Sequence, residues 1–340
     1  MNSLSGKVIW DTVGSVVLKG NPLGDPRTRE LAVYLPPSYP EELDRRYPVI
    51  FYLPGFAGIP RGAAPSHPWK ESLIERLDRL IVSRKAAECV LVVPDCFTKY
   101  GGSQYRNSEA TGRYEDHIIS ELVDYIDGKY RTLRGAGQRA VMGKSSGGYG
   151  ALWLGMRHPD VFGHLVCHSG DVSFETCYGV DFPKCVNTLE KFGGSFQKFL
   201  KEFSFARDKN SFPHELVNIA GMASSYSPNK KSPMGFDIPF DETTGEVLPK
   251  VWKRWQACDP VHLAKKHAGN LKKLKTVYFD CGRKDEFYLH LGARRFSREL
   301  KRLGVSHVYE EHELGHFNMG ERYDLSFERL GVAFRKAHGV

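Results

Sequence analysis

No run of apolar residues approaches the ~20 that a membrane-spanning helix requires. The first residues, MNSLSGKVIWDT, also lack the apolar segment of a secretory signal. Motifs typical of metal sites are missing as well, because the chain has no HExxH and no CxxC and its histidines are mostly isolated. We therefore expect a cytoplasmic protein without a membrane span, a bound metal or a cofactor.

Cysteine pairing is only weakly indicated. The seven cysteines are scattered, and an odd number spread in this way predicts reduced thiols in a cytosolic protein rather than a disulfide framework. Cys177 and Cys185 are close enough in the sequence to pair if the protein were exported. The cysteines therefore favour a cytoplasmic location, with export as the alternative.

Concentrated charge is absent too. The formal net charge of +8 favours anionic partners only slightly. The basic run KKHAGNLKKLK at 265–275 has no interleaved aromatic residues, which favours a solvated helix end over a nucleic-acid surface. We expect no nucleic-acid partner, and the oligomeric state is not readable from the sequence.

The sequence does contain a repeated alternation of buried strands and amphipathic helices. With 340 residues, 41% of them hydrophobic, the chain can form one α/β domain with a sizeable core and an insertion. Helical spacing of apolar residues recurs in 73–81 and 118–126, among the continuous apolar segments YPVIFYL, ECVLVVP, RAVMG, FGHLVCH and TVYFDCG. This pattern predicts a mostly parallel central sheet with helices on both faces.

The carboxyl ends of the strands are where such sheets bind their ligands. We therefore expect one site to be surrounded by the loops that follow five positions: Leu53, Pro94, Gly143, His168 and Asp280. Segments far apart in the sequence should thus meet at this site.

The alternation stops between about 172 and 260, where aromatic residues are frequent. They could pack against the sheet domain, line the site, or do both. One helical face there carries four phenylalanines: Phe192, Phe196, Phe199 and Phe203. We predict an α/β core formed by 1–172 and 261–340, with a mainly helical, cap-like insertion at 173–260.

The stretch RAVMGKSSGGYGAL at 139–152 places two serines in a glycine-rich corner behind an apolar strand. A phosphate loop needs four residues between its first glycine and the Gly-Lys pair, whereas five residues, which form the strand itself, separate Gly137 from Gly143. The pattern G-x-S-x-G from Gly143 to Gly147 instead fits a strand-to-helix turn that holds Ser145 above the sheet. Ser145 is therefore the candidate nucleophile.

A serine hydroxyl needs a base to accept its proton and an acid to orient that base. In sites built on such a turn, the acid and the histidine follow the serine in that order. Asp285 lies in the turn of YFDCGRKDEF, where it could also be a helix N-cap, and Asp280 lies at the end of the strand. His316 follows a glycine in the loop of YEEHELGHFNM, and His312 lies at a strand end. We predict Ser145, Asp285 and His316 as the catalytic triad.

Acyl transfer also needs N–H donors for the oxyanion. One predicted donor is the backbone N–H of Ser146, directly after the nucleophile. The other is the backbone N–H of Phe56, because Gly55 frees the backbone to turn at the end of the early strand.

The chain resembles the esterase D type of α/β hydrolases, which includes S-formylglutathione hydrolases, enterochelin esterases, feruloyl esterases and mycolyltransferases. The resemblance rests on YPVIFYLPGFAG, GRYEDHIISELVDYID, GKSSGGYGALWLGMRHPDVFG, FDCGRKDEF and ELGHF, over roughly 1–172 and 270–340. It implies the α/β-hydrolase fold, and the family's triad positions match Ser145, Asp285 and His316. It does not extend to the insertion, which would set the choice of substrate.

The sequence thus predicts a serine carboxylester hydrolase that acts through an acyl-enzyme on short-to-medium acyl or aryl esters, thioesters included, with a small-molecule ester as its partner. An acyltransferase that passes the acyl group to an alcohol or sugar is the alternative. A binding module on an inactive scaffold is disfavoured because every triad position is occupied. Within the insertion, Trp252 and Trp255 are expected to form an apolar wall for the substrate.

Overall fold

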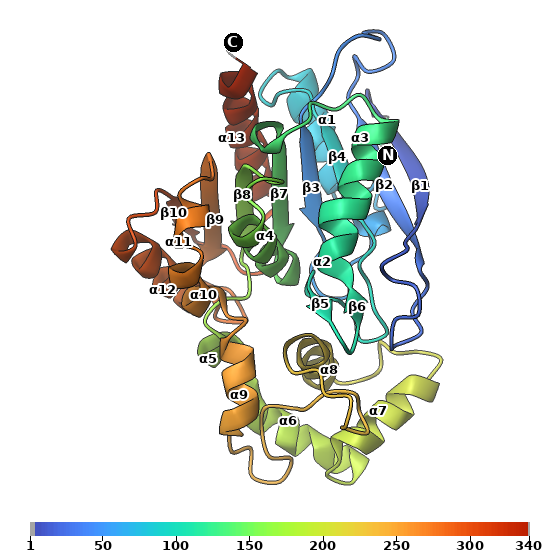
Figure 1. The fold of residues 1–340 in the computed structure, drawn as a ribbon, viewed down its shortest axis with the longest axis vertical. Helices are drawn as coiled ribbons and strands as arrows, with labels where there is room; N and C mark the ends of the chain where they lie inside the picture. The colour runs from blue at the N-terminus through green and yellow to red at the C-terminus, as the bar shows by residue number, and fades with distance from the viewer. Residues whose placement is uncertain (1–3, 339–340) are drawn as a thin grey trace.

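The computed structural model describes residues 4–338 and centres on one eight-stranded sheet (Figure 1). The strands follow the order β1-β2-β4-β3-β7-β8-β9-β10 across the sheet. β1 and β4 pair with β2 in antiparallel fashion, and the other neighbouring pairs are parallel. The bounds of the strands are β1 (Lys7–Gly14), β2 (Thr28–Leu35), β3 (Val49–Leu53), β4 (Val90–Pro94), β7 (Arg139–Lys144), β8 (His164–His168), β9 (Thr276–Gly282) and β10 (Val308–His312), with a small separate hairpin of β5 (Asn107–Ser108) and β6 (Gly112–Arg113).

Helices cover both faces of the sheet, which confirms the predicted fold class (Figure 1). Alternate side chains of a strand point to opposite faces. In β3, Ile50 and Tyr52 therefore join the core beneath one set of helices, and Phe51 and Leu53 join the core beneath the other. The first set is α1 (Leu73–Val82) and α13 (Gly320–His338), and the second includes α3 (Val123–Lys129), α4 (Ser146–Arg157) and α12 (Leu289–Arg302).

Several shorter helices complete the core. A short α2 and a π-helical turn lead directly into α3, and α10 and α11 pack against α4 and α12. Their bounds are α2 (Tyr114–Asp116), the π-helix (His117–Leu122), α10 (Pro260–Lys266) and α11 (Ala268–Leu271). Since α10 lies with the core helices, the chain has rejoined the α/β core by about residue 260.

The segment predicted as an insertion, 173–260, follows β8, reaches the first residue of α10 and contributes no strand to the main sheet. Figure 1 shows its helices gathered at one end of the molecule. Of the four phenylalanines expected on one helical face, Phe196, Phe199 and Phe203 lie on α7 (Phe196–Phe205), whereas Phe192 lies in a separate 3-10 turn because Gly193 and Gly194 turn the chain with positive φ before α7 begins. All four rings are buried and pack mainly on one another, on Phe212 and on Tyr100. Their role is packing. The other helices are α5 (Phe174–Cys177), α6 (Phe182–Leu189), α8 (His214–Tyr226) and α9 (Pro249–Gln256).

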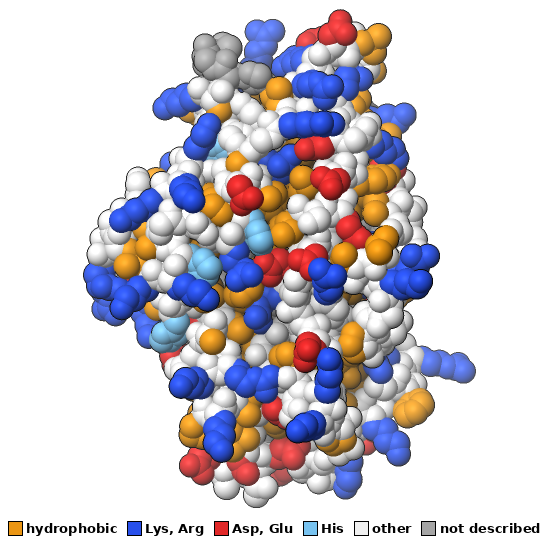
Figure 2. Space-filling model, viewed as in Figure 1, with side chains coloured by type: hydrophobic (Ala, Val, Ile, Leu, Met, Phe, Trp, Pro, Cys, Tyr) orange, Lys and Arg blue, Asp and Glu red, His pale blue; other side chains and the backbone are white. Residues whose placement is uncertain are grey.

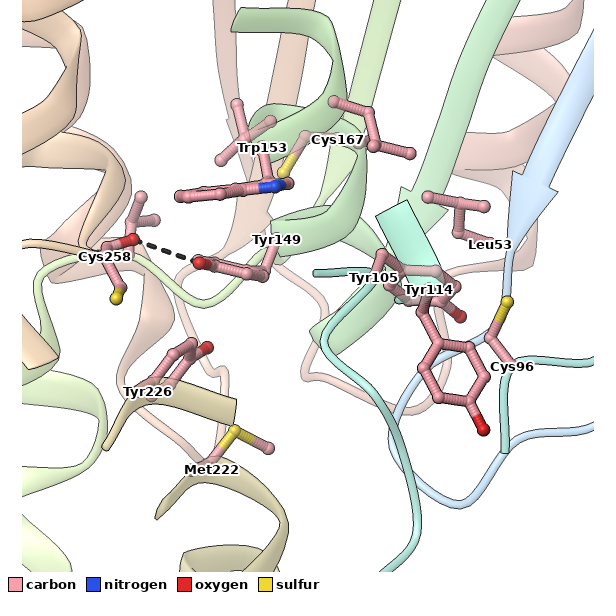
Figure 3. Packing of buried hydrophobic residues seen from close by; sticks show 14 of the residues in the cluster. Leu53, Cys96, Tyr105, Tyr114, Tyr149, Trp153, Cys167, Met222, Tyr226 and Cys258 are labelled. Atoms are coloured by element: carbon pink, nitrogen blue, oxygen red, sulfur yellow. Dashed lines mark hydrogen bonds between the residues drawn. The ribbon is translucent and has the colours of Figure 1, made fainter. Parts of the chain in front are cut away.

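The insertion is joined to the sheet domain by a continuous aromatic core (Figure 3). Tyr149 of α4 lies between Trp153 and Tyr226 of α8, with ring centroids 6.3 Å and 5.5 Å away. Its hydroxyl donates a hydrogen bond of 3.1 Å to the Cys258 carbonyl oxygen. The helix that follows Ser145 is therefore anchored to both parts of the molecule.

The seven cysteines are buried free thiols, Cys177 and Cys185 included. Within residues 4–338, none of the helices has the length and apolar character required to span a bilayer. On the face shown in Figure 2, Lys and Arg are spread from one end of the molecule to the other, with Asp and Glu between them.

Candidate active site

Ser145 occupies a strained turn between β7 and α4. Its backbone has φ 57° and ψ −127°, in a region that residues with a side chain rarely adopt. The neighbouring glycines make the turn possible, since a Cβ on Gly147 would lie 1.9 Å from the Leu53 carbonyl oxygen and one on Gly143 would lie 2.1 Å from that of Gly147. The two glycines of G-x-S-x-G are thus required by close backbone contacts, and the turn is held against the end of β3.

His316 and Asp285 form a buried pair, with 2.8 Å between His316 Nδ1 and Asp285 Oδ2. The other carboxylate oxygen, Oδ1, accepts hydrogen bonds from the backbone N–H groups of Phe287 at 3.0 Å and Leu289 at 3.4 Å. Burial opposes ionisation of Asp285, but these donors and the charge of His316 hold its pKa below the usual range. An ionised Asp285 keeps the proton of a neutral His316 on Nδ1, so Nε2 can act as a base.

The loop that carries His316 is fixed by two further contacts. The His316 backbone N–H donates to Glu286 Oε2 at 2.6 Å. The imidazole ring lies between Phe287 and Phe317, with centroid distances of 4.8 Å and 5.2 Å. These contacts orient the ring toward a cavity of about 760 Å³ that Ser145 and His316 both line, a volume typical of a small-molecule site.

The competing acid and base lie elsewhere. Asp280 accepts hydrogen bonds from His168 and from the Arg322 Nε, each at 2.8 Å, so its carboxylate belongs to a buried structural network. His312 is not among the residues that line the cavity, and neither of its ring nitrogens has a partner among the described residues. The structure therefore pairs Asp285 with His316 and keeps Asp280 and His312 apart from them.

Two backbone N–H groups are available beside Ser145. A Cβ on Gly55 would lie 3.4 Å from the Ser145 Cβ, so the Gly55-Phe56 corner lies directly against the turn. The Phe56 N–H makes no hydrogen bond with any residue in 4–338, and the Ser146 N–H, in the first turn of α4, has no intrahelical partner. A bond of 2.7 Å from the Ala57 N–H to the Gly101 carbonyl oxygen fixes the corner. Both predicted oxyanion donors thus adjoin the candidate nucleophile.

A family model described as "Putative esterase" matches residues 25–319, which is most of the chain. The chain belongs to this family. The family agrees with the resemblance to esterase D-type α/β hydrolases, and the protein is an esterase. A search of curated proteins finds no match to the sequence.

Solved structures show that the esterase shares its fold over nearly the whole chain. A ferulic acid esterase superposes with a TM-score of 0.64 at 20% identity, covering 98% of this chain and 100% of that chain. An S-formylglutathione hydrolase from Agrobacterium tumefaciens has a TM-score of 0.61 at 15% identity, covering 98% of both chains. A fluorophosphonate-binding serine hydrolase of Staphylococcus aureus has a TM-score of 0.59 at 16% identity, covering 97% and 98%. At these identities the likeness is one of fold.

The two tryptophans of the insertion are not placed as the sequence analysis expected. Neither lines the cavity of the esterase. Trp255 is fully buried, donates a hydrogen bond of 2.8 Å to the Ser227 hydroxyl and packs on Tyr226. Trp252 packs against Trp255 and Phe182. These indoles belong to the packing of the insertion because the face of α9 that carries them turns inward.

Other residues of the insertion do reach the cavity, and none of them was predicted from the sequence. The lining includes five of its side chains: Cys177, Tyr178, Asp181, His214 and Asn218. The His214 ring lies edge-on to Phe56, with centroids 5.8 Å apart, and 6.0 Å from Phe287. No periodicity or motif marks His214, because it reaches the site only through the path of α8.

Two polar lining residues from the sheet domain were also missed. Lys144 is the first variable residue of G-x-S-x-G, and burial lowers its pKa to about 8 although the charge of Asp285 opposes this shift. Asp171 lies just after β8, in one of the loops expected to surround the site. The rule that strand ends form the site indicated this loop without identifying the residue.

One group of side chains outside the cavity has the composition of a metal site. Ligand atoms of Glu175, Asp259 and His262 lie within 4.8 Å of one another. Asp259 already accepts hydrogen bonds from the backbone N–H groups of Ser173 and Phe174, and Glu175 forms an ion pair with Arg295. Their negative charge is thus used by the protein itself, and none of the three lines the cavity.

Proposed function

We propose that the esterase hydrolyses short-to-medium acyl or aryl esters, thioesters included, through an acyl-enzyme on Ser145. One observation carries the proposal: Ser145 lies on a strained turn in the same cavity as His316, whose Nδ1 is held by Asp285. A serine on a strained turn that shares a cavity with an oriented imidazole is the arrangement that activates a hydroxyl for attack on a carbonyl.

The first half of the reaction forms the acyl-enzyme. His316 Nε2 takes the proton of the Ser145 hydroxyl as Oγ attacks the ester carbonyl. The N–H groups of Phe56 and Ser146 donate to the oxyanion, and losing one such donor costs about 10²–10³ in rate. The intermediate collapses when His316 returns the proton to the leaving alcohol, and Asp285 stabilises the imidazolium in between.

Water completes the cycle by attacking the acyl-enzyme with the same base. If an alcohol or sugar took the place of water, the same residues would perform acyl transfer, so the two activities differ in the acceptor alone. Adding a polyol and comparing the rates of hydrolysis and alcoholysis separates them. We expect hydrolysis to dominate at every polyol concentration.

The helical insertion is proposed to cap one side of the cavity. Its five lining residues support this role, and His214 forms an aromatic group with Phe56 and Phe287 in place of the two tryptophans. Aromatic walls bind apolar groups with graded preference, about 1–3 kcal/mol per methylene. The profile should therefore favour compact acyl or aryl groups over long chains. The seven buried thiols support our further proposal of a cytoplasmic location.

Replacement of the nucleophile tests the proposed function. The Ser145→Ala variant should lose ester hydrolysis and covalent labelling by a serine-directed phosphonate while its circular dichroism stays unchanged. Ser169→Ala is the matched control, because Ser169 is also a positive-φ serine after a strand of the sheet, and it should keep its labelling. Labelling of the Ser145→Ala variant, or loss of labelling in the control alone, would contradict the assignment.

A further inference from the structure

Asp171 is a buried carboxyl group in the wall of the active-site cavity that the proposed mechanism does not use. It lies three residues past the end of β8, and 5% of its surface is exposed. Its Oδ2 accepts three hydrogen bonds, from the hydroxyls of Ser146 at 3.0 Å and Tyr178 at 2.8 Å and from Gln104 Nε2 at 3.4 Å. Since Ser146 directly follows Ser145, this carboxylate lies close to the reacting centre.

The second carboxylate oxygen of Asp171, Oδ1, has no such donors among the described residues. Oδ1 accepts no hydrogen bond from any residue in 4–338, yet it is not sealed from solvent as an orphaned core atom would be. Asp171 is one of the residues that line the cavity, and Oδ1 is its carboxylate oxygen left without a donor from the described part of the chain. A carboxylate oxygen in a largely buried side chain is more stable with a hydrogen-bond donor than without one, so a donor supplied by a ligand would satisfy Oδ1.

We propose that Asp171 Oδ1 accepts a hydrogen bond from a hydroxyl group of the ester, which makes Asp171 a specificity-determining residue for hydroxylated esters. The inference rests on the proposed ester hydrolysis at Ser145 and names the substrate class for it. The three donors on Oδ2 hold the carboxylate in one orientation, so the acceptor is fixed before the substrate arrives. Such preorganisation strengthens discrimination because no side-chain freedom is lost on binding.

A neutral hydroxyl fits this position better than an ammonium group. His316 becomes positively charged during each turnover. Burial raises the pKa of the Asp171 carboxyl, whereas the hydrogen bonds from Tyr178 and Ser146 and the charge of His316 favour its ionised form. A substrate ammonium at Oδ1 would lie near that second positive charge, and burying a cation is itself unfavourable. The remaining donors around Asp171 are the neutral side chains of Ser146, Tyr178 and Gln104.

The Asp171→Asn variant tests the proposal because the hydrogen bonds around the side chain fix which end of the new amide faces the cavity. The three donors at Oδ2 require an acceptor, so the amide oxygen takes that place and the amide NH₂ faces the cavity. An acceptor for the substrate thereby becomes a donor, with almost no change in volume. The substitution keeps the internal hydrogen bonds of Asp171 in place. If the role of Asp171 were merely structural, the variant would therefore behave as the wild type does.

The measurement uses pairs of esters that carry a hydroxyl or its methyl ether at successive positions of the acyl and alcohol groups. For at least one position, wild-type kcat/KM should be higher for the hydroxyl ester, and Asp171→Asn should lower the hydroxyl-to-ether ratio by about tenfold or more. The matched control is Asp181→Asn, another carboxyl group of the cavity wall, which should leave the ratio unchanged. An amino-substituted ester completes each set.

Three results would overturn the inference: a wild-type ratio that favours no hydroxyl at any position, the same ratio in wild type and Asp171→Asn, or a preference for the amino ester. The wild-type series can refute the inference even if the variant fails to fold. Failure of the proposed function would be seen separately, because Ser145→Ala would then keep hydrolysis of the unsubstituted ester and phosphonate labelling. A normal plain-ester rate with an unchanged ratio counts against Asp171 alone.

Discussion

Asp285→Asn is the sharpest test of how the base is oriented. Two backbone N–H groups, from Phe287 and Leu289, point at Asp285 Oδ1. They will hold the amide oxygen of the asparagine in that place, which turns its NH₂ toward His316 Nδ1. Because Nδ1 then accepts a hydrogen bond, the imidazole proton moves to Nε2, and the nitrogen that should receive the Ser145 proton is blocked.

The size of the loss follows from this wrong tautomer. Substitution of the triad acid by its amide lowers kcat by about 10⁴ in the chymotrypsin-type triad, which corresponds to about 5.5 kcal/mol in the activation barrier. We expect a similar fall in kcat for hydrolysis of a 4-nitrophenyl ester, with KM nearly unchanged because the carboxyl group does not contact substrate. Thermal unfolding should show that the variant remains folded at the assay temperature.

The control for this prediction is Asp280→Asn. Its carboxylate bridges His168 and Arg322 inside the core. The substitution should therefore lower the melting temperature, while kcat per folded molecule changes little. If Asp280→Asn reduced kcat of the folded enzyme more than Asp285→Asn did, Asp280 would be the acid and the reasoning from the hydrogen bonds would be refuted.

Three further predictions concern the base, the core and the acid limit of stability. His316→Ala should lower kcat by several orders of magnitude and His312→Ala by less than about tenfold, and the reverse ranking in steady-state assays would contradict the assignment of the base. Trp255→Ala should destabilise the protein by about 3–5 kcal/mol in urea unfolding, because the indole is fully buried, while the ester profile of the folded fraction stays unchanged; an altered profile would return Trp255 to the substrate site. Burial raises the pKa of Glu115, but His158, Arg157 and Trp153 outweigh it and lower the pKa to about 2, so the folded state gains stability above the unfolded pKa near ~4.3 that is lost as pH falls toward 2. In the Glu115→Gln variant, the free energy of unfolding should fall less steeply between pH 5 and about 2 than in the wild type. An unchanged dependence on pH would show that other carboxyl groups produce it.

The parts of this molecule that the sequence predicted are those where local chemistry leaves few alternatives. Gly143 and Gly147 could be recognised because a Cβ at either position collides with backbone, so the pattern itself requires a tight strand-to-helix turn. The order of strands and helices followed from buried segments whose apolar residues run without interruption, as in β3. Asp285 was harder to prefer over Asp280 from the sequence. The hydrogen-bond partners of Asp280 are His168 and Arg322, which lie far away along the chain.

The insertion shows where such reasoning stops. An excess of aromatic residues predicts burial but not the surface against which each ring is buried. Trp255 satisfies its indole N–H through Ser227 inside the insertion, whereas His214, which no pattern distinguished, lines the cavity. The direction in which a helix face turns depends on tertiary packing across the whole insertion, and no local period encodes it.

Residues that carry out the reaction are marked by local sequence patterns, whereas residues that select the substrate are not. Attack on an ester demands a nucleophile, a base and an acid of fixed chemical types in a fixed order, so the proposed triad of Ser145, Asp285 and His316 can be recognised in one sequence. Selection demands only that some polar atom face the substrate, and the elements that orient it can come from anywhere. Asp171 is oriented by Gln104 and Tyr178, which lie in two other loops. If Asp171 selects the substrate as we propose, a change in any one of these three residues should alter which esters are accepted while the hydrogen bond between His316 and Asp285 stays as it is.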